Sequence, residues 1–262
     1  MITLLKLGGS LITDKNRAHT ANTDVIKQLG YEIRSVWENE PFPLILGHGS
    51  GSFGHIPAKK YGTRTGVRTG EEWAGFAEVH AEATALNRIV TDILRGVGLP
   101  VISFVPMDSI RTADGRITFW DTAVIRDCIR RGLIPLIFGD TVFDSVRGGT
   151  ILSTEDLFVH LCKTLEEPPR ILLAGLEAGV WADYPKNTLL IPVIRAEGPD
   201  ADVAIKGSEF PDVTGGMKEK VHLMQELIQN GQADSAVIFS GAAENELVHV
   251  LNNEPAGTLI IS

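Results

Sequence analysis

Residues 43–62 read PLILGHGSGSFGHIPAKKYG, a short apolar run that passes directly into a stretch crowded with glycine. The run Pro43–Leu46 has the length and apolar character of a buried strand. The glycines after it let backbone N–H groups approach a ligand closely, as they do around phosphate oxygens. His55 stands at the far end of these glycines. The stretch predicts a strand that ends in an anion-binding turn, with an ordinary turn as the simpler alternative.

Short apolar runs alternate with helical segments along the whole chain. Strands are predicted at 2–7, 43–47, 101–106, 134–138, 170–174, 235–240 and 258–262. Helices are predicted near 22–38, 72–97, 120–132, 154–165, 216–230 and 244–252. The strand runs are continuously apolar, as expected for strands covered by helices on both faces. The pattern predicts an α/β fold, a three-layer αβα sandwich with a mainly parallel central sheet.

Two segments interrupt this alternation. Residues 107–119 contain TADGRITF and residues 142–152 read VFDSVRGGTIL, and each predicts a β-hairpin around Asp-Gly or Gly-Gly. Residues 183–213, rich in Pro, Asp and Gly, form the longest irregular stretch. Because no linker divides the chain, a single domain over residues 1–262 is predicted.

Composition excludes several classes of function. The 262 residues carry a formal net charge of −9, which argues against broad nucleic-acid binding but not against small phosphate ligands. No run approaches the ~20 apolar residues of a membrane span, and the N-terminus lacks a signal-peptide pattern. Cys128 and Cys162 are predicted to be buried free thiols rather than a disulfide. The expectation is a cytoplasmic protein without nucleic-acid or membrane partners.

Three glycine motifs follow strands or precede a helix, where ligands gather in parallel α/β sheets. The first is KLGGSLITDK at 6–15, the second is the opening stretch, and the third is DVTGGMKEKV at 212–221. Lysines in the first and third motifs add positive charge beside exposed N–H groups. Neither a P-loop nor a dinucleotide-binding fingerprint after the first strand is present. Each motif alone fits an ordinary turn as well as a phosphate site.

Taken in this order, with Gly139-Asp140 after the fourth strand, the motifs resemble those of the amino acid kinase superfamily over essentially the full length. That resemblance implies ATP as phosphoryl donor without a P-loop, and Mg²⁺ held by few protein ligands. HGSGSFGH followed by PAKKYG is similar to the phosphate-acceptor motif of the isopentenyl phosphate kinases. The implied reaction is phosphorylation of isopentenyl phosphate to isopentenyl diphosphate.

The resemblance also implies a role for each motif residue. Lys6 bridges the β- and γ-phosphates, and Lys220 contacts the ATP phosphates. Lys15 lies near the γ-phosphate, with an exposed solvated lysine as the alternative. Asp140 orients the lysines, with a plain helix or turn cap as an equal alternative. His55 binds the phosphate of the acceptor, together with Gly49, Gly54 and Gly139. The remaining residues expected at ATP are Gly8, Gly9, Ser10, Ser50, Gly215 and Gly216. His48 is expected to be structural.

The same resemblance divides the domain and suggests its assembly. Residues 1–165 are expected to bind the acceptor and residues 166–262 the nucleotide. The protein is expected to form a homodimer. An isoprenoid tail needs an apolar pocket beside His55. In the sequence, the apolar residues of such a pocket look the same as residues of the ordinary core. The candidates for its walls are Tyr61, Trp73, Phe76, Val79 and Ile151.

Three departures from the family pattern leave alternatives open. Ser50 replaces a glycine, STED at 153–156 stands where S-G-D is usual, and GLEAGVW at 175–181 lacks two aspartates. The last two lie toward the nucleotide half and leave nucleotide choice and metal handling open. The alternatives are a kinase for another small phosphate or phosphonate such as fosfomycin, and a nucleotide or phosphate sensor without turnover.

Overall fold

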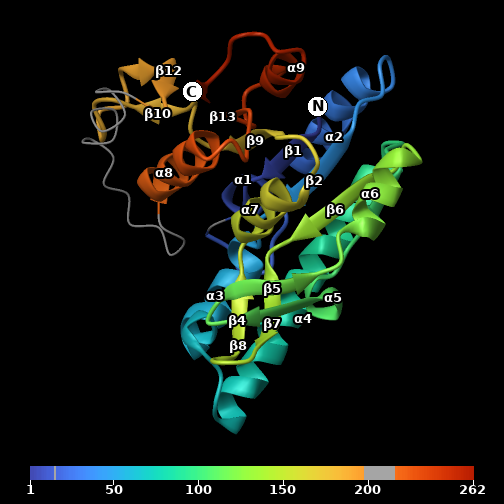
Figure 1. The fold of residues 1–262 in the computed structure, drawn as a ribbon, viewed down its shortest axis with the longest axis vertical. Helices are drawn as coiled ribbons and strands as arrows, with labels where there is room; N and C mark the ends of the chain where they lie inside the picture. Colours follow the sequence, from blue (N-terminus) through green and yellow to red (C-terminus); the bar gives the residue numbers. More distant parts are fainter. Residues whose placement is uncertain (15, 198–215) are drawn as a thin grey trace.

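The computed structural model describes residues 1–14, 16–197 and 216–262, and its centre is an eight-stranded sheet (Figure 1). Across the sheet the strands are β12 (Val193–Arg195), β14 (Thr258–Ile261), β13 (Ser235–Ser240), β9 (Arg170–Gly175), β1 (Thr3–Leu7), β2 (Leu44–His48), β6 (Ile134–Phe138) and β3 (Val101–Ser103). Within these described residues, every neighbouring pair is parallel except β13 and β14. The mainly parallel sheet is therefore confirmed.

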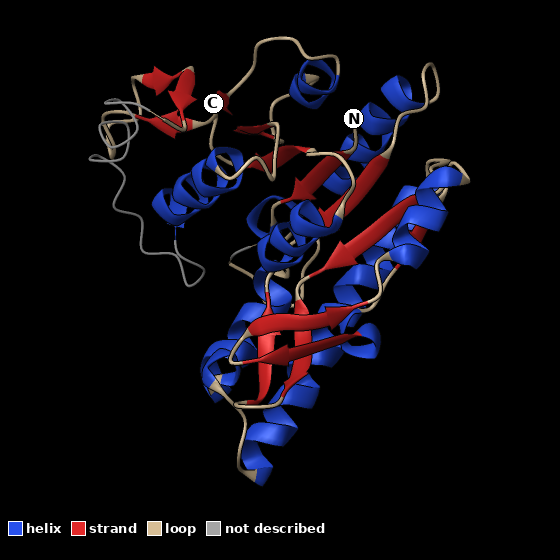
Figure 2. Ribbon diagram, viewed as in Figure 1, coloured by secondary structure: helices blue, strands red, loops and turns tan. Residues whose placement is uncertain are grey.

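Helices cover both faces of this sheet (Figure 2). Neighbouring residues of a strand point to opposite faces, so Leu4 of β1 lies in one core cluster and Leu5 in the other. The Leu4 cluster is covered by α6 (Ala123–Arg130), α7 (Thr154–Thr164) and α8 (Gly216–Gln229). The Leu5 cluster is covered by α1 (Gly9–Ile12), α2 (Thr23–Trp37), α4 (Gly70–Gly96) and α9 (Glu246–Leu251). The three-layer prediction is confirmed.

The two predicted hairpins form a second sheet with the strand order β5-β4-β7-β8. One hairpin joins β4 (Ile110–Ala113) to β5 (Arg116–Trp120), and the other joins β7 (Asp140–Asp144) to β8 (Gly148–Leu152). A short helix, α5 (Pro106–Ser109), precedes them. The Asp144 carboxylate accepts backbone N–H bonds from Asp114 (3.0 Å) and Gly115 (2.7 Å). These bonds tie one hairpin's turn to the other hairpin, so the pair forms one unit.

The sequence did not predict the helix α3 (Gly51–Tyr61), which follows the opening strand. Glycine and Pro57 make this segment a poor helix by intrinsic propensity. Tertiary packing stabilises it instead, because Phe53 is buried in the Leu5 cluster and α3 packs along α4. Gly62, in a left-handed conformation, ends the helix before the turn η1 (Thr63–Thr65).

Smaller differences occur elsewhere in the chain. The strand predicted at 101–106 ends at Ser103, because Pro106 begins α5. The irregular stretch contains the short strand β11 (Leu190–Ile191), which pairs with β10 (Val180–Trp181); its residues 198–213 lie outside the described residues. Cys128 and Cys162 are buried free thiols, as predicted. Among the helices described, none has the length and apolar character needed to cross a membrane.

Candidate active site

The carboxyl ends of β1, β2, β6 and β9 meet at one edge of the central sheet, and a pocket of about 360 Å³ opens there. Its walls include most of the predicted site residues. Those lining the pocket are Lys6, Gly8, Gly9, Ser10, Gly49, Ser50, Gly54, His55, Gly139, Gly216 and Lys220. The topology thus brings together motifs that stand more than 200 residues apart in sequence.

Two of the glycine loops touch each other at the floor of the pocket. A Cβ on Gly9 would lie 2.5 Å from the backbone nitrogen of Gly51, and a Cβ on Gly49 would lie 2.7 Å from that of Gly9. Such distances exclude any side chain at either position without a shift of the backbone. These glycines are therefore required by the close approach of two chains, which leaves their peptide groups at the pocket wall.

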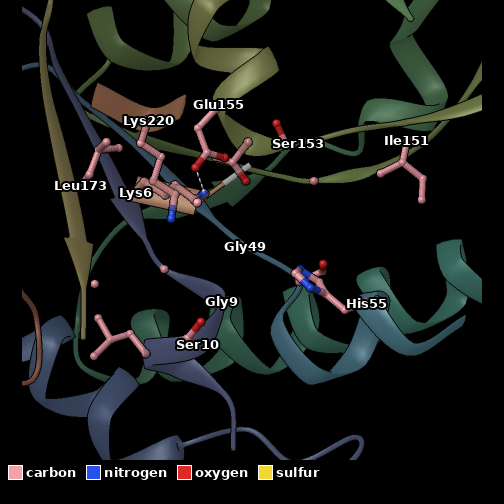
Figure 3. A pocket seen from close by; sticks show the side chains of 18 of the residues that line it. Lys6, Gly9, Ser10, Gly49, His55, Ile151, Ser153, Glu155, Leu173 and Lys220 are labelled. Atoms are coloured by element: carbon pink, nitrogen blue, oxygen red, sulfur yellow. Dashed lines mark hydrogen bonds and ion pairs between the residues drawn. The ribbon is translucent and has the colours of Figure 1, made fainter. Parts of the chain in front are cut away.

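Helix α3 begins at the pocket and carries His55 in its second turn. Ser50, Gly54 and His55 line the pocket around the start of this eleven-residue helix. The helix dipole at such a terminus favours an anion. The N–H groups of Ser52 and Gly54 already donate to the Thr13 hydroxyl and the Ser50 carbonyl, so the dipole and the N–H groups that precede Ser52 remain for a ligand. Figure 3 shows His55 beyond Gly49, on the side of Ile151 and away from the lysines. A histidine there is placed to bind a second anion next to the first.

Lys6, Lys220 and Glu155 form a charged cluster in the middle of the pocket (Figure 3). The Lys6 ammonium donates a hydrogen bond to the Glu155 carboxylate, and each side chain is only 13% exposed. Burial alone would raise the pKa of Glu155, but the charges of Lys6 and Lys220 outweigh it and lower the pKa. Glu155 is therefore ionised at neutral pH, and it holds Lys6 in a fixed position.

The structure places Asp140 away from the lysines that it is predicted to orient. Its side chain is fully buried at the start of β7, away from the pocket lining. It accepts the backbone N–H of Thr141 at 2.7 Å and lies 3.1 Å from Nδ1 of His80 on α4. Glu155 of the STED segment is the carboxylate at the lysines. The sequence could not distinguish these two acids, because a strand end and a helix start are equally plausible positions for a carboxylate near the lysines.

His48 lies beneath the pocket as a structural residue. Its ring stacks on Phe138, and its Nε2 is 3.2 Å from the amide oxygen of Asn87. Burial lowers its pKa, so the ring is neutral at pH 7. The Thr154 hydroxyl donates to the His48 carbonyl and joins β2 to the start of α7. This agrees with the structural role expected for His48.

The end of the pocket beyond His55 is mainly apolar. Ala58 of α3, Val79 and Ala83 of α4 and Ile151 of β8 form its wall. Tyr61, Trp73 and Phe76, proposed from the sequence, do not line the pocket. Trp73 and Phe76 pack against each other and against Phe143 instead.

Lys59 and Arg64 line the pocket, and the Arg64 guanidinium lies 3.7 Å from the Asp156 carboxylate. Sequence reasoning missed Arg64, because no spacing or motif relates η1 to the start of α7.

The opposite end of the pocket is formed by the segment after β9 and by the start of α8. The residues that line it are Leu173, Gly175, Leu176, Glu177, Met217 and Ile238. The indole N–H of Trp181 donates to the Glu177 carboxylate at 2.9 Å. This end thus combines apolar side chains with one carboxylate that is already positioned.

Two predicted residues, Lys15 and Gly215, lie outside the described residues. Within the described part of the chain, no three His, Cys, Asp or Glu side chains gather as a metal site. The pocket therefore presents cations and backbone N–H groups to one anion in the middle and another near His55. That arrangement suits transfer of a phosphoryl group between two bound phosphates.

A sequence model of the amino acid kinase family matches residues 1–240. The chain belongs to the amino acid kinase family. Its fold, with a parallel sheet and glycine loops at the carboxyl ends of the strands, is the family's fold as found in solved members.

Within the family, the chain is similar to proteins named isopentenyl phosphate kinase. That of Methanocaldococcus jannaschii is 31% identical over 99% of this chain and 98% of its own. That of Methanothermobacter thermautotrophicus is 32% identical over 98% of both chains. X-ray structures of an isopentenyl phosphate kinase superpose with a TM-score of 0.82 and 28% identity, covering 99% of this chain and all of the other.

Proposed function

We propose that this protein transfers the γ-phosphoryl group of ATP to isopentenyl phosphate, giving isopentenyl diphosphate and ADP. The observation that supports this most is the single continuous pocket with Lys6 and Lys220 at its centre and His55 beside an apolar end. The lysines suit the donor phosphates, His55 suits the acceptor phosphate, and the apolar end suits a hydrocarbon tail. The similarity to proteins named isopentenyl phosphate kinase over nearly the whole chain supports this reaction.

The chemistry requires little more than positioning. An oxygen of the acceptor phosphate forms a bond to the γ-phosphorus as the bond from that phosphorus to the β,γ-bridging oxygen breaks. The acceptor is already ionised at neutral pH, so no strong general base is needed. Lys6 and Lys220 stabilise the charge that spreads over the transferred oxygens, and the negative charge of Glu155 keeps Lys6 directed into the pocket. Lys15 is proposed to lie near the γ-phosphate.

We propose Mg²⁺ as the accompanying ion. The described pocket holds no cluster of carboxylates, and its central carboxylate is engaged by Lys6, which fits a metal carried mainly by nucleotide phosphates. When bound, the ion would neutralise charge on the β- and γ-phosphate oxygens. Residues 1–165 are proposed to bind the acceptor and 166–262 the nucleotide, in a cytoplasmic homodimer.

The test is a coupled ADP-release assay with Mg-ATP and, in parallel, isopentenyl phosphate, dimethylallyl phosphate and fosfomycin. We expect isopentenyl phosphate to react with a kcat/KM above about 10⁴ M⁻¹s⁻¹, the low end for working enzymes. Turnover with fosfomycin alone would move the acceptor class to small phosphonates. ATP binding with no turnover of any acceptor would support a sensor instead.

A further inference from the structure

One carboxylate in the pocket has no part in the mechanism above. Glu177 lines the pocket from the segment that follows β9, in the part of the chain where GLEAGVW departs from the family pattern. Among the hydrogen bonds between described residues, its carboxylate is engaged by one donor, the indole N–H of Trp181. A carboxylate at a site built for phosphates would repel them, unless it meets a part of the ligand that donates hydrogen bonds.

The segment that carries Glu177 is held firmly from both sides. Gly8 donates its N–H to the carbonyl of Ala174 at 2.8 Å, and Gly241 donates to the carbonyl of Gly175 at 2.8 Å. The Ser240 hydroxyl contributes a longer bond of 3.5 Å to the carbonyl of Leu176. The end of β9 therefore moves with β1 and β13. With Trp181 fixing its side chain, the carboxylate is in place before a ligand arrives.

Glu177 lies a short way along the chain from the glycine loop that is proposed to bind the phosphates. Gly8, in the first glycine motif, is bonded directly to Ala174, and Glu177 follows three residues later. Three residues span at most about 10 Å. In a nucleoside triphosphate the ribose adjoins the α-phosphate, so a group within this distance of the phosphate-binding glycines can reach the sugar. The apolar side chains of Leu176 and Met217 line the same end and suit the flat face of a base.

From this placement we infer that Glu177 accepts hydrogen bonds from the ribose 2′- and 3′-hydroxyls of the donor nucleotide and selects ribonucleotides over deoxyribonucleotides. A carboxylate can accept two hydroxyl donors from a vicinal diol, and acidic residues hold ribose in this way in other nucleotide sites. The indole of Trp181 acts as a positioning group for that carboxylate. The inference rests on one part of the proposed function, namely that the phosphoryl donor is a nucleotide.

The test is isothermal titration of ATP, 2′-deoxy-ATP and 3′-deoxy-ATP, without acceptor, into the full-length protein and its variants. Removing a hydrogen bond to a charged group weakens binding about 10- to 150-fold. We expect the wild type to bind each deoxy analogue more weakly than ATP by at least the lower factor. Glu177→Ala should lose a comparable factor for ATP and bind all three nucleotides with similar affinity.

Further variants separate recognition from folding. Trp181→Phe keeps the carboxylate but removes its indole donor, so its discrimination between ATP and the deoxy analogues should fall while the protein stays folded. Glu219→Ala changes an exposed carboxylate on α8 and should bind all three nucleotides as the wild type does. Retained discrimination in Glu177→Ala would overturn the inference. GTP is titrated into the same proteins, and an altered ratio of ATP to GTP affinity in that variant, with ribose discrimination intact, would overturn the inference in favour of base recognition.

The same experiment distinguishes this inference from the proposed function. Nucleotide titration requires no acceptor and no turnover, so an inactive protein that still discriminates ribose through Glu177 would support the inference while contradicting the kinase assignment. Full activity with isopentenyl phosphate, together with equal use of ATP and deoxy-ATP, would support the kinase assignment and contradict the inference about Glu177.

Discussion

The ammonium of Lys6 and the carboxylate of Glu155 form an ion pair between residues 149 positions apart in sequence. Lys6 comes from β1 and Glu155 from the first turn of α7, so the pair joins the central strand of the sheet to a covering helix. Lys220 at the start of α8 adds a second positive charge that Glu155 offsets. The negative charge of this one carboxylate thus reduces the repulsion between the two lysine ammonium groups in the same pocket.

Glu155→Gln should lower kcat more than it raises the KM for either substrate. The glutamine keeps nearly the same shape but loses the charge that holds Lys6, so the lysine is no longer fixed where charge develops during transfer. A loss on the order of 10- to 100-fold in kcat is expected for a misplaced charged group. Steady-state kinetics, varied in ATP and in isopentenyl phosphate, measures the two effects separately.

A matched control is Glu166→Gln, which changes an exposed carboxylate just beyond the same helix. Its kinetics should equal those of the wild type. If Glu155→Gln also retained the wild-type kcat, Glu155 would have no positioning role and the lysines would be held by other contacts.

His55→Ala should lower kcat/KM for isopentenyl phosphate by about 10- to 150-fold, the value of one charge-assisted hydrogen bond. ATP affinity should change little, because His55 lies on the Ile151 side of the pocket and away from Lys6 and Lys220. His222→Ala, at an exposed position of α8, is the control. An unchanged kcat/KM in the His55 variant, measured by ADP release, would remove His55 from acceptor binding.

The sequence predicted the layers, the sheet and the hairpins because each depends on a local pattern that packing did not override. Continuous apolar runs such as 134–138 became central strands, and Asp114-Gly115 became a hairpin turn with positive φ at both residues. Helix α3 was not predicted because its stability comes from Phe53 in the core rather than from propensity.

For the site, the glycine motifs and the lysines could be predicted from the sequence, because ligands in parallel α/β sheets bind at the carboxyl ends of the strands. The identity of the paired acid was not readable, since Asp140 and Glu155 both stand near strand or helix ends in the sequence. Only their burial and contacts separate them: Asp140, at the start of β7, lies 3.1 Å from the His80 ring, whereas Glu155 pairs with Lys6. The walls of the apolar end depend equally on side-chain direction, which places Val79 at the pocket and Phe76 against Phe143.

Ala83→Leu should impair use of isopentenyl phosphate without weakening ATP binding. Ala83 is 2% exposed and lines the apolar end of the pocket from α4, so a longer side chain would occupy space proposed for the hydrocarbon tail. Overfilling a packed site typically costs ~1–3 kcal/mol, equivalent to a loss of about 5- to 150-fold in kcat/KM.

Ala77→Leu provides the matched control, because Ala77 is exposed on the same helix. Thermal melts of both variants separate a blocked pocket from a damaged fold. Equal kcat/KM for isopentenyl phosphate in Ala83→Leu and the wild type would place the tail elsewhere.

The contact between His80 and Asp140 predicts a stability contribution that is lost at alkaline pH. The hydrogen bond to Asp140 raises the pKa of His80 against the opposing effect of burial, with the charges of Asp140 and Asp108 adding to the rise. A folded-state pKa above the unfolded value of about 6.5 means that folding favours the protonated ring. The contribution is therefore fully present below pH 6.5 and disappears as the pH rises through the higher folded-state pKa.

Urea unfolding of the wild type and His80→Gln between pH 5.5 and pH 9 measures this contribution directly. The difference between the two unfolding free energies should be largest at the acid end and should shrink toward pH 9, where the neutral ring can still donate to Asp140 but no longer carries charge. His222→Gln, an exposed histidine on α8, should show no such convergence. A difference between wild type and His80→Gln that stays constant or grows with pH would mean that His80 is neutral in the folded protein throughout this range.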